Sequence, residues 1–245
     1  GLVPGVVAVM LLSSATVFLG LKSACAAGQK GMGREVEVEQ RVKPLLEADL
    51  KKAGLRYGAP VFLRIFKREK ELELWMQGDG KDYVLFRSYP ICTYSGELGP
   101  KLRQGDGQAP EGFYRVALGQ LNPASRFHLS FNLGYPNAYD RAHSRTGDFL
   151  MVHGNCVSVG CYAMGDDGIE EIYSLVAAAL RAGQSAFDVH AFPFRLDAAS
   201  LDAQRRSQWH GFWSELKPAY DAFEATRQPP QIGVVAGHYR LVESR

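Results

Sequence analysis

The sequence lacks a strong charge bias, an internal repeat and any abundance of cysteine. Its 28 basic and 26 acidic residues give a formal charge of +2 at pH 7, and both signs are mixed along the chain. This balance provides no broad basic field, which argues against a nucleic-acid partner and against general attraction to an anionic membrane. The 245 residues are 46% apolar, so the chain can bury one sizeable core, and we expect one main domain with appendages.

Charged side chains are also missing from the first 21 residues. Lys22 follows, and the small residues Ala24-Cys25-Ala26 then match a secretory cleavage pattern. About 20 apolar residues are also long enough to remain as a membrane anchor. A lipid anchor on Cys25 fits less well, because Lys22 stands where that signal needs an apolar residue. We expect residues 1–27 to be an export signal or an N-terminal anchor, and the remainder to be exported.

Export matters for the few thiols. Beyond Cys25 the chain has only Cys92, Cys156 and Cys161. In an oxidising compartment these three can form at most one disulfide, so at least one thiol stays unpaired within the chain. An unpaired thiol there is either a liability or a reactive group.

Apolar periodicity predicts the secondary structure in the first half of the chain. Residues 28–58 are expected to be a linker and a short helix, whose apolar positions begin at Val42 and which ends before Gly54. Alternation with period two predicts strands over 61–66, 71–76, 83–89, 113–118, 127–133 and 148–153. The glycine-rich, basic segment between Tyr89 and Phe113 is a long loop, and loops of that length are usually functional or mobile.

In the second half of the chain, the spacing of apolar residues changes from the period of a strand to that of a helix. A helix is predicted through Ile169 and Leu180, with Asp167 and Glu170 as a capping pair and Gly183 at its end. A strand over 187–192, a helix around 212–223 and a terminal hairpin over 231–243 follow. Two histidines are assigned structural roles by this pattern, His128 on the polar face of its strand and His190 within the strand 187–192.

The stretch MVHGNCVSVGCYAM, from Met151 to Met164, concentrates reactive side chains. His153 would end a strand, on the same face as Phe149 and Met151. A cysteine nucleophile needs a base and backbone N–H groups for the oxyanion, and this stretch offers His153 as base and Cys161 as nucleophile. Gly160 would let the backbone approach a substrate carbonyl. Cys156 is the weaker nucleophile, and it can instead be a core thiol or the disulfide partner of Cys92.

A zinc site is the competing interpretation of the same residues. His143, His153, Cys156 and Cys161 form a ligand set that suits zinc. Their spacings do not form a regular finger pattern, so we prefer the nucleophile.

These residues closely resemble the motif of the YkuD-fold L,D-transpeptidases, and in particular their YafK-like branch. The family pattern is a strand-borne histidine with glycine after it, then serine or threonine, any residue, glycine and the catalytic cysteine. It corresponds here to His153-Gly154 and to Ser158-Val159-Gly160-Cys161. The segment 109–114, APEGFY, is similar to the Pro-x-Gly-x-Phe element of the family, and segments 94–114, 133–143 and 212–230 are similar to the YafK-like branch.

The resemblance implies an α+β, β-rich fold. This is a YkuD-like mixed β-sandwich over residues 59–195, with a helix after the catalytic loop and a helix-plus-hairpin extension over 196–245 packed on it. It also implies a periplasmic enzyme without a cofactor that acts on peptidoglycan stem peptides. Cys161 would attack the carbonyl on the L-centre of meso-diaminopimelate and form a thioester, with His153 as base and with Ser158 and Gly160 shaping the loop.

The implied outcome depends on the acceptor. An amine acceptor gives a new cross-link, whereas water gives cleavage, and the YafK-like branch is associated with release of an outer-membrane lipoprotein from the wall. A silent peptidoglycan-binding module is the non-enzymatic alternative.

The sequence departs from the broad family at two positions near the nucleophile. Ala163 and Val159 stand where many members carry arginine and histidine. Because stem peptides carry carboxylates, we expect another cation to bind them, with Arg141 as first choice and Arg103 as second.

Overall fold

The computed structural model describes residues 1–2 and 33–242, and the account below concerns residues 33–242. The predicted export signal or anchor therefore lies outside the described residues, apart from its first two positions. Within the described part of the chain, no helix has the length and apolar character needed to cross a membrane.

The larger sheet has five strands in the order β3-β2-β1-β10-β5. Its strands are β1 (Val61–Phe66), β2 (Glu71–Gln77), β3 (Tyr83–Pro90), β5 (Gly112–Ala117) and β10 (Ala186–Phe192). The strands β1 and β10 run parallel at its centre, and the other neighbours are antiparallel. These five strands confirm the period-two predictions to within one or two residues.

The second sheet is made of short strands in the order β4-β9-β8-β7-β6. They are β4 (Thr93–Tyr94), β6 (Leu121–Asn122), β7 (Ser130–Asn132), β8 (Met151–His153) and β9 (Tyr162–Ala163), with the 3₁₀ helix η1 (Leu118–Gln120) before β6. The predicted strands 127–133 and 148–153 were too long. His128 and Phe149 adopt φ angles of 68° and 52°, a left-handed conformation that interrupts a strand. Phe149 therefore does not share the strand face of Met151 and His153.

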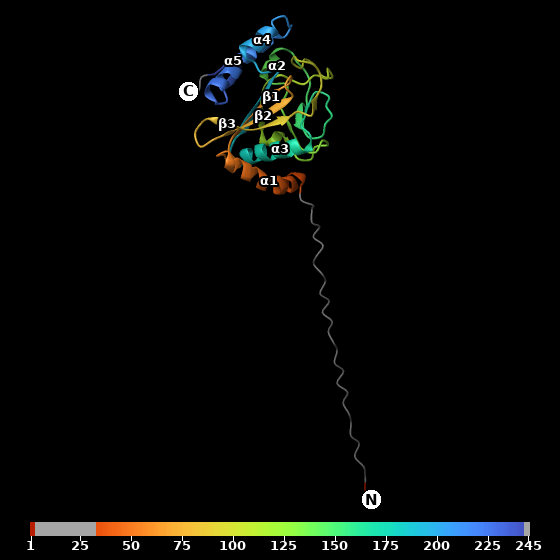
Figure 1. The fold of residues 1–245 in the computed structure, drawn as a ribbon. Helices are drawn as coiled ribbons and strands as arrows, with labels where there is room; N and C mark the ends of the chain where they lie inside the picture. The colour runs from red at the N-terminus through yellow and green to blue at the C-terminus, as the bar shows by residue number, and fades with distance from the viewer. Residues whose placement is uncertain (3–32, 243–245) are drawn as a thin grey trace. The chain divides into compact units, whose positions relative to one another are not determined.

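Helices cover both faces of the five-stranded sheet (Figure 1). On one side lie α1 (Arg34–Lys52) and α3 (Asp166–Arg181), next to each other. On the other lie α4 (Ala198–Ala203) and α5 (His210–Thr226), and the hairpin β11 (Ile232–Val235) and β12 (His238–Leu241) contacts α5. The short α2 is Ala138–Ala142. This arrangement confirms the predicted α+β class, with a helix after the 151–164 stretch and a C-terminal helix and hairpin.

Two helix starts differ from the predictions. The helix α1 begins at Arg34 rather than near Val42, because Val38 extends the buried stripe by another turn. The predicted cap of α3 was wrong, since its N-cap residue is Gly165 and no side chain caps it. Glu170 pairs instead with Arg41 and with His128, so this carboxylate connects α3 to α1 and to the loop before β7.

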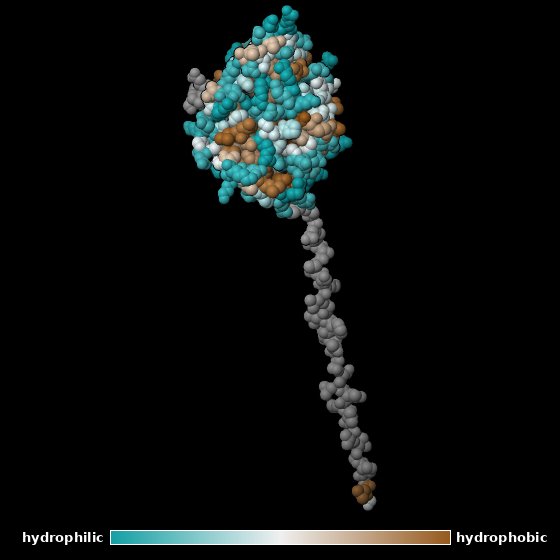
Figure 2. Space-filling view, viewed as in Figure 1, coloured by the Kyte–Doolittle hydropathy of each residue, from teal (hydrophilic) through white to brown (hydrophobic). Residues whose placement is uncertain are grey.

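The hydrophobic core lies mainly between the two sheets and under α1 and α3. It includes Val189 of β10, Phe131 of β7 and Ile172 of α3. A second cluster, with Phe192 and Trp213, lies beneath α5. On the face seen in Figure 2, hydrophobic residues form separate patches within a largely hydrophilic surface.

A buried ion pair holds the long loop between β3 and β5. The Lys67 ammonium lies 3.0 Å from Glu111, and both side chains are fully buried. Lys67 also donates to the carbonyls of Glu97, Gly99 and Ala109, and Trp213 donates to the second carboxylate oxygen of Glu111. Glu111 belongs to the APEGFY motif, so this part of the motif fixes the loop against β1 and α5.

Candidate active site

The pairing of β8 with β9 sets the position of Cys161 relative to His153. The strands run parallel, with Val152 opposite Tyr162 and His153 opposite Ala163. This register places Cys161 beside Met151, two residues before His153, which corresponds to roughly 7 Å along a strand. His153 thus ends β8, and Cys161, eight residues later in the sequence, directly precedes the neighbouring strand β9.

The Cys161 thiol lies against the backbone at the start of β8. Its sulfur accepts a hydrogen bond from the N–H of Met151 at 3.4 Å and donates to the carbonyl of Phe149 at 3.7 Å. The left-handed conformation of Phe149 turns this carbonyl towards the sulfur. Phe149 is itself 67% exposed, so the backbone holds the thiol while the ring faces solvent.

The His153 imidazole is buried and fixed in orientation. Its exposed fraction is 2%, and its Nδ1 hydrogen-bonds to the carbonyl of Gly154. Because a carbonyl can only accept, Nδ1 carries the proton in the neutral ring and Nε2 keeps the lone pair. The Phe127 ring packs on the imidazole, with 4.7 Å between ring centres.

Burial favours the neutral form of both groups. It lowers the pKa of His153, although the hydrogen bond to Gly154 acts in the opposite direction. It raises the pKa of the Cys161 thiol, while the Met151 N–H and the charge of Lys101 lower it. Both the thiol and the imidazole are therefore neutral in the resting site, and the thiol needs general-base help to form a thiolate.

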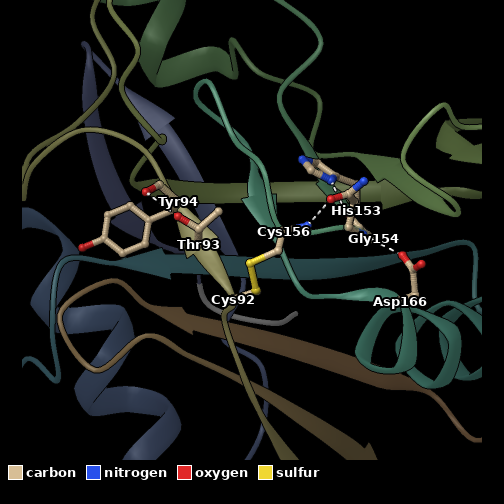
Figure 3. The surroundings of a disulfide bond; sticks show 8 residues. Cys92, Thr93, Tyr94, His153, Gly154, Cys156 and Asp166 are labelled. Carbon is tan, nitrogen blue, oxygen red and sulfur yellow. Dashed lines mark hydrogen bonds between the residues drawn. A yellow bond between two sulfur atoms is a disulfide. The ribbon is translucent and has the colours of Figure 1, made fainter.

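A disulfide joins Cys92 to Cys156 and leaves Cys161 as the free cysteine of the described residues. It connects the segment before β4 to the loop between His153 and Cys161, as Figure 3 shows beside Thr93 and Tyr94. The zinc interpretation was wrong, because the disulfide removes Cys156 from the ligand set. His143 instead packs its ring on Tyr139 of α2.

The loop residues Ser158 and Gly160 shape the backbone next to the nucleophile. The Ser158 hydroxyl donates to the carbonyl of Cys161 at 2.6 Å. Gly160 has a φ of 101°, a conformation that suits glycine, and its N–H donates to the hydroxyl of Ser95. Ser95 was missed at the sequence level, because nothing in its local pattern indicates that it faces residue 160.

The two predicted arginines lie on separate parts of the surface. The Arg141 guanidinium donates to the carbonyl of Pro136 within its own turn. Arg103 lines a pocket of about 290 Å³ together with Gln108 and Trp209. The cation whose charge acts on the thiol is Lys101, which is buried and paired with Asp106 at 2.5 Å.

A larger pocket, of about 840 Å³, is lined in part by the disulfide cysteines Cys92 and Cys156. Its lining includes Asn155, Cys156, Met164 and Arg87. Cys161 does not line this pocket, so we locate the candidate chemistry from the thiol rather than from this pocket. His128 and His190 lie away from the thiol: His128 pairs with Glu170, and His190 is enclosed by aromatic rings.

An unpaired thiol and a buried, oriented imidazole on paired strands define a candidate site for cysteine-dependent acyl transfer. The chain is 51% identical over 182 residues to the proteins named "Putative L,D-transpeptidase YafK" of Escherichia coli K12 and of Escherichia coli O157:H7, which covers 74% of this chain and 74% of each relative. The chain therefore belongs to the L,D-transpeptidase family, in its YafK-like branch. No family model matches the chain.

Solved structures give weaker similarities. The helical cell shape determining protein Pgp2 of Campylobacter jejuni is 16% identical, with a TM-score of 0.44 over 78% of this chain and 80% of that chain. A mutant of the same protein is 18% identical, with a TM-score of 0.46 over 79% of this chain. The chain spans 65% of that mutant, slightly less than two thirds of its length. Bd1075 of Bdellovibrio bacteriovorus is 19% identical, with a TM-score of 0.40 over 64% of this chain and 57% of that chain.

Proposed function

We propose that this protein is a cysteine-dependent acyl enzyme of peptidoglycan that acts on the L-centre carbonyl of meso-diaminopimelate in stem peptides. The observation that supports the proposal is the pairing of β8 with β9, whose register puts the free Cys161 next to Met151, two residues before the oriented imidazole of His153. Family membership supplies the substrate class.

The first half-reaction forms a thioester. Nε2 of His153 takes the proton of the Cys161 thiol, and the sulfur forms a bond to the substrate carbonyl carbon. Catalytic hydrogen bonds commonly tighten only when substrate binds, so the imidazole needs to approach the thiol in the complex. The oxyanion then collapses, the C–N bond breaks, and the leaving amine takes the proton from the imidazolium.

The second half-reaction releases the acyl group. Nε2 of His153 takes a proton from the acceptor, and the acceptor attacks the thioester carbonyl. The C–S bond then breaks, and the imidazolium gives its proton to the sulfur, which returns Cys161 as a thiol and His153 as a neutral base. An amine acceptor completes a transpeptidation, whereas water completes a hydrolysis.

Release of a wall-bound lipoprotein is the second candidate, and the rim of the site favours it. Phe149, Val157 and Val159 are 67%, 54% and 84% exposed, and all three lie in the stretch that borders Cys161. Stem peptides and sugars are polar, so an apolar rim fits a substrate that also carries a protein chain. The same thioester chemistry serves this substrate.

Arg103 and Arg141 are proposed as contacts for stem-peptide carboxylates. Arg103 has support from its pocket, where Trp209 and Gln108 provide an aromatic wall and an amide. Arg141 offers an exposed guanidinium, although it also bonds to Pro136.

The proposal includes an exported, periplasmic location. The disulfide between Cys92 and Cys156 supports it, because such bonds persist in oxidising compartments.

The test is mass spectrometry of muropeptides after isolated cell walls with bound lipoprotein are incubated with the chain and with its Cys161→Ala variant. New diaminopimelate-to-diaminopimelate links made only by the wild type would establish a transpeptidase. Loss of lipoprotein-derived peptide, with free stems appearing, would establish a hydrolase. Identical products from both proteins would reject the enzyme and favour a binding module.

A further inference from the structure

We infer that Ser95 is a positioning residue of this site, whose hydroxyl holds the peptide plane between Val159 and Gly160 and thereby helps to aim the next backbone N–H, that of Cys161, at the oxyanion. The inference rests on the proposed acyl chemistry and adds a residue to it.

Ser95 reaches the nucleophile loop through sheet pairing. It directly follows β4, which pairs antiparallel with β9 so that Tyr94 lies opposite Tyr162. The next residue of this register therefore faces Cys161. The Ser95 hydroxyl accepts the N–H of Gly160, the residue before the nucleophile.

The hydroxyl is itself held in place from the other side. It donates to the carbonyl of Gly107 at 2.7 Å, and the backbone carbonyl of Ser95 accepts the N–H of Ala109 at 3.1 Å. Lys101 and Asp106 support this loop, since Asp106 accepts the backbone N–H groups of residues 102, 103 and 108. Ser95 therefore connects the loop that carries Cys161 to the segment 101–109, which these hydrogen bonds hold in place.

Gly160 needs such a support. Glycine has no Cβ to restrict its backbone, and its φ of 101° is one of several conformations open to it. Rotation of this residue would change the direction of the following N–H, on Cys161. Because the N–H of Gly160 donates to Ser95, the N–H of Cys161 is the donor that we assign to the oxyanion. The alignment of this N–H determines how well it stabilises the transition state.

Comparing the rates of acylation and alkylation of the Cys161 thiol distinguishes this role from a general effect on the reactivity of the thiol. Attack on a carbonyl builds an oxyanion, whereas alkylation by iodoacetamide builds none at the carbon that is attacked. Loss of the Ser95 hydroxyl should therefore slow acylation and leave alkylation unchanged. A merely structural role would alter both or neither.

The experiment compares Ser95→Ala, Ser95→Thr and the control Thr93→Val, two residues earlier on the same segment. The Thr93 hydroxyl makes only a 3.5 Å contact, to the carbonyl of Tyr94. We expect Ser95→Ala to lower kcat on isolated cell walls about 10- to 100-fold with KM and the iodoacetamide rate within about twofold of the wild type. Ser95→Thr keeps the hydroxyl and should recover most of kcat.

Amide hydrogen exchange of residues 157–161 gives a readout that needs no substrate. We expect faster exchange in Ser95→Ala and unchanged exchange in Thr93→Val. Wild-type kcat and exchange in Ser95→Ala would overturn the inference and leave the proposed function intact. Equal loss of kcat and alkylation, with no rescue by Ser95→Thr, would also overturn it. A wild type that matches Cys161→Ala would reject the proposed function itself.

Discussion

His153 donates the proton of Nδ1 to the carbonyl oxygen of Gly154, the next residue in the chain. The base thus needs no side-chain partner to fix its tautomer. Met151, two residues earlier, directs its N–H to the sulfur of Cys161. One three-residue strand therefore supplies the base and a backbone contact to the nucleophile.

The pH dependence of kcat/KM should reflect the burial of His153. A base must be neutral to act, and burial lowers the pKa of this imidazole below its ordinary 6.5. Activity should be present above the lowered pKa and lost as pH falls through it, so the acid limb should have its midpoint below pH 6.5. An acid midpoint at or above 6.5 would contradict the role assigned to His153.

Replacing the base should separate catalysis from thiol chemistry. We expect His153→Gln to lower kcat by about 10²- to 10⁴-fold, the usual contribution of general-base catalysis. Because burial raises the pKa of the Cys161 thiol above 9.0, its alkylation by iodoacetamide should increase with pH beyond that value in both proteins. Steady-state rates and alkylation profiles measure the two effects, and an unchanged kcat would remove His153 from the mechanism.

Removing the disulfide should destabilise the protein and loosen the site. Cys92 and Cys156 are 64 residues apart, and closing a loop of that length corresponds to about 4 kcal/mol in the chain-entropy model. The double variant Cys92→Ala, Cys156→Ala should lose roughly that free energy of unfolding in urea titrations. Cys161→Ala is the matched control, since it removes a cysteine and keeps the bond. Equal stability of the two variants would show that the bond is dispensable.

Breaking the buried ion pair should be costly. Glu111→Gln leaves the Lys67 charge buried without its counterion, and such changes typically cost about 3 to 5 kcal/mol. Glu97→Gln is the control, because Lys67 donates to the backbone carbonyl of Glu97, which this change keeps. Urea titrations should show a large loss for the first variant and little change for the second. Equally small losses in both variants would mean that the contacts of Lys67 with backbone carbonyls hold the loop.

His190 should make the fold sensitive to acid. Burial, with the charge of Arg64, lowers its pKa to about 3. The unfolded chain therefore binds a proton first, and stability is complete above about pH 6.5 and falls as pH decreases towards 3, by up to about 1.4 kcal/mol per pH unit. His190→Phe should lose this component between pH 6 and 4. Its neighbours Phe62 and Phe113 already form an aromatic site, and Nδ1 of His190 has no hydrogen-bond partner to lose. A pH slope equal to that of the wild type would contradict this assignment.

The two arginines can be compared directly. Arg103→Ala should raise KM for wall fragments about tenfold or more if the pocket it lines holds a stem carboxylate, while iodoacetamide still labels Cys161 at the wild-type rate. Arg141→Ala tests the other candidate in the same assay. A variant with unchanged KM would exclude its arginine from the site.

Local sequence determined the elements whose pattern is strong. The five strands of the larger sheet, the stripe from Ile169 to Leu180 and the terminal hairpin follow from local patterns of apolar and polar residues. The sequence also singled out His153 and Cys161 as the candidate reactive pair, which stays a prediction, and its four cysteines limited the possible disulfides.

Only the tertiary structure decided which groups meet. The disulfide of Cys92 with Cys156, the hydrogen bond of Ser95 to Gly160 and the ion pair of Lys67 with Glu111 join residues 44 to 65 positions apart, and no local pattern encodes such partners. The left-handed residues His128 and Phe149 made two strands, β7 and β8, begin later than the local pattern predicts. The sequence thus determines which side chains are chemically reactive. Their orientation and surroundings are decided only when segments that are distant in the chain come together in the fold.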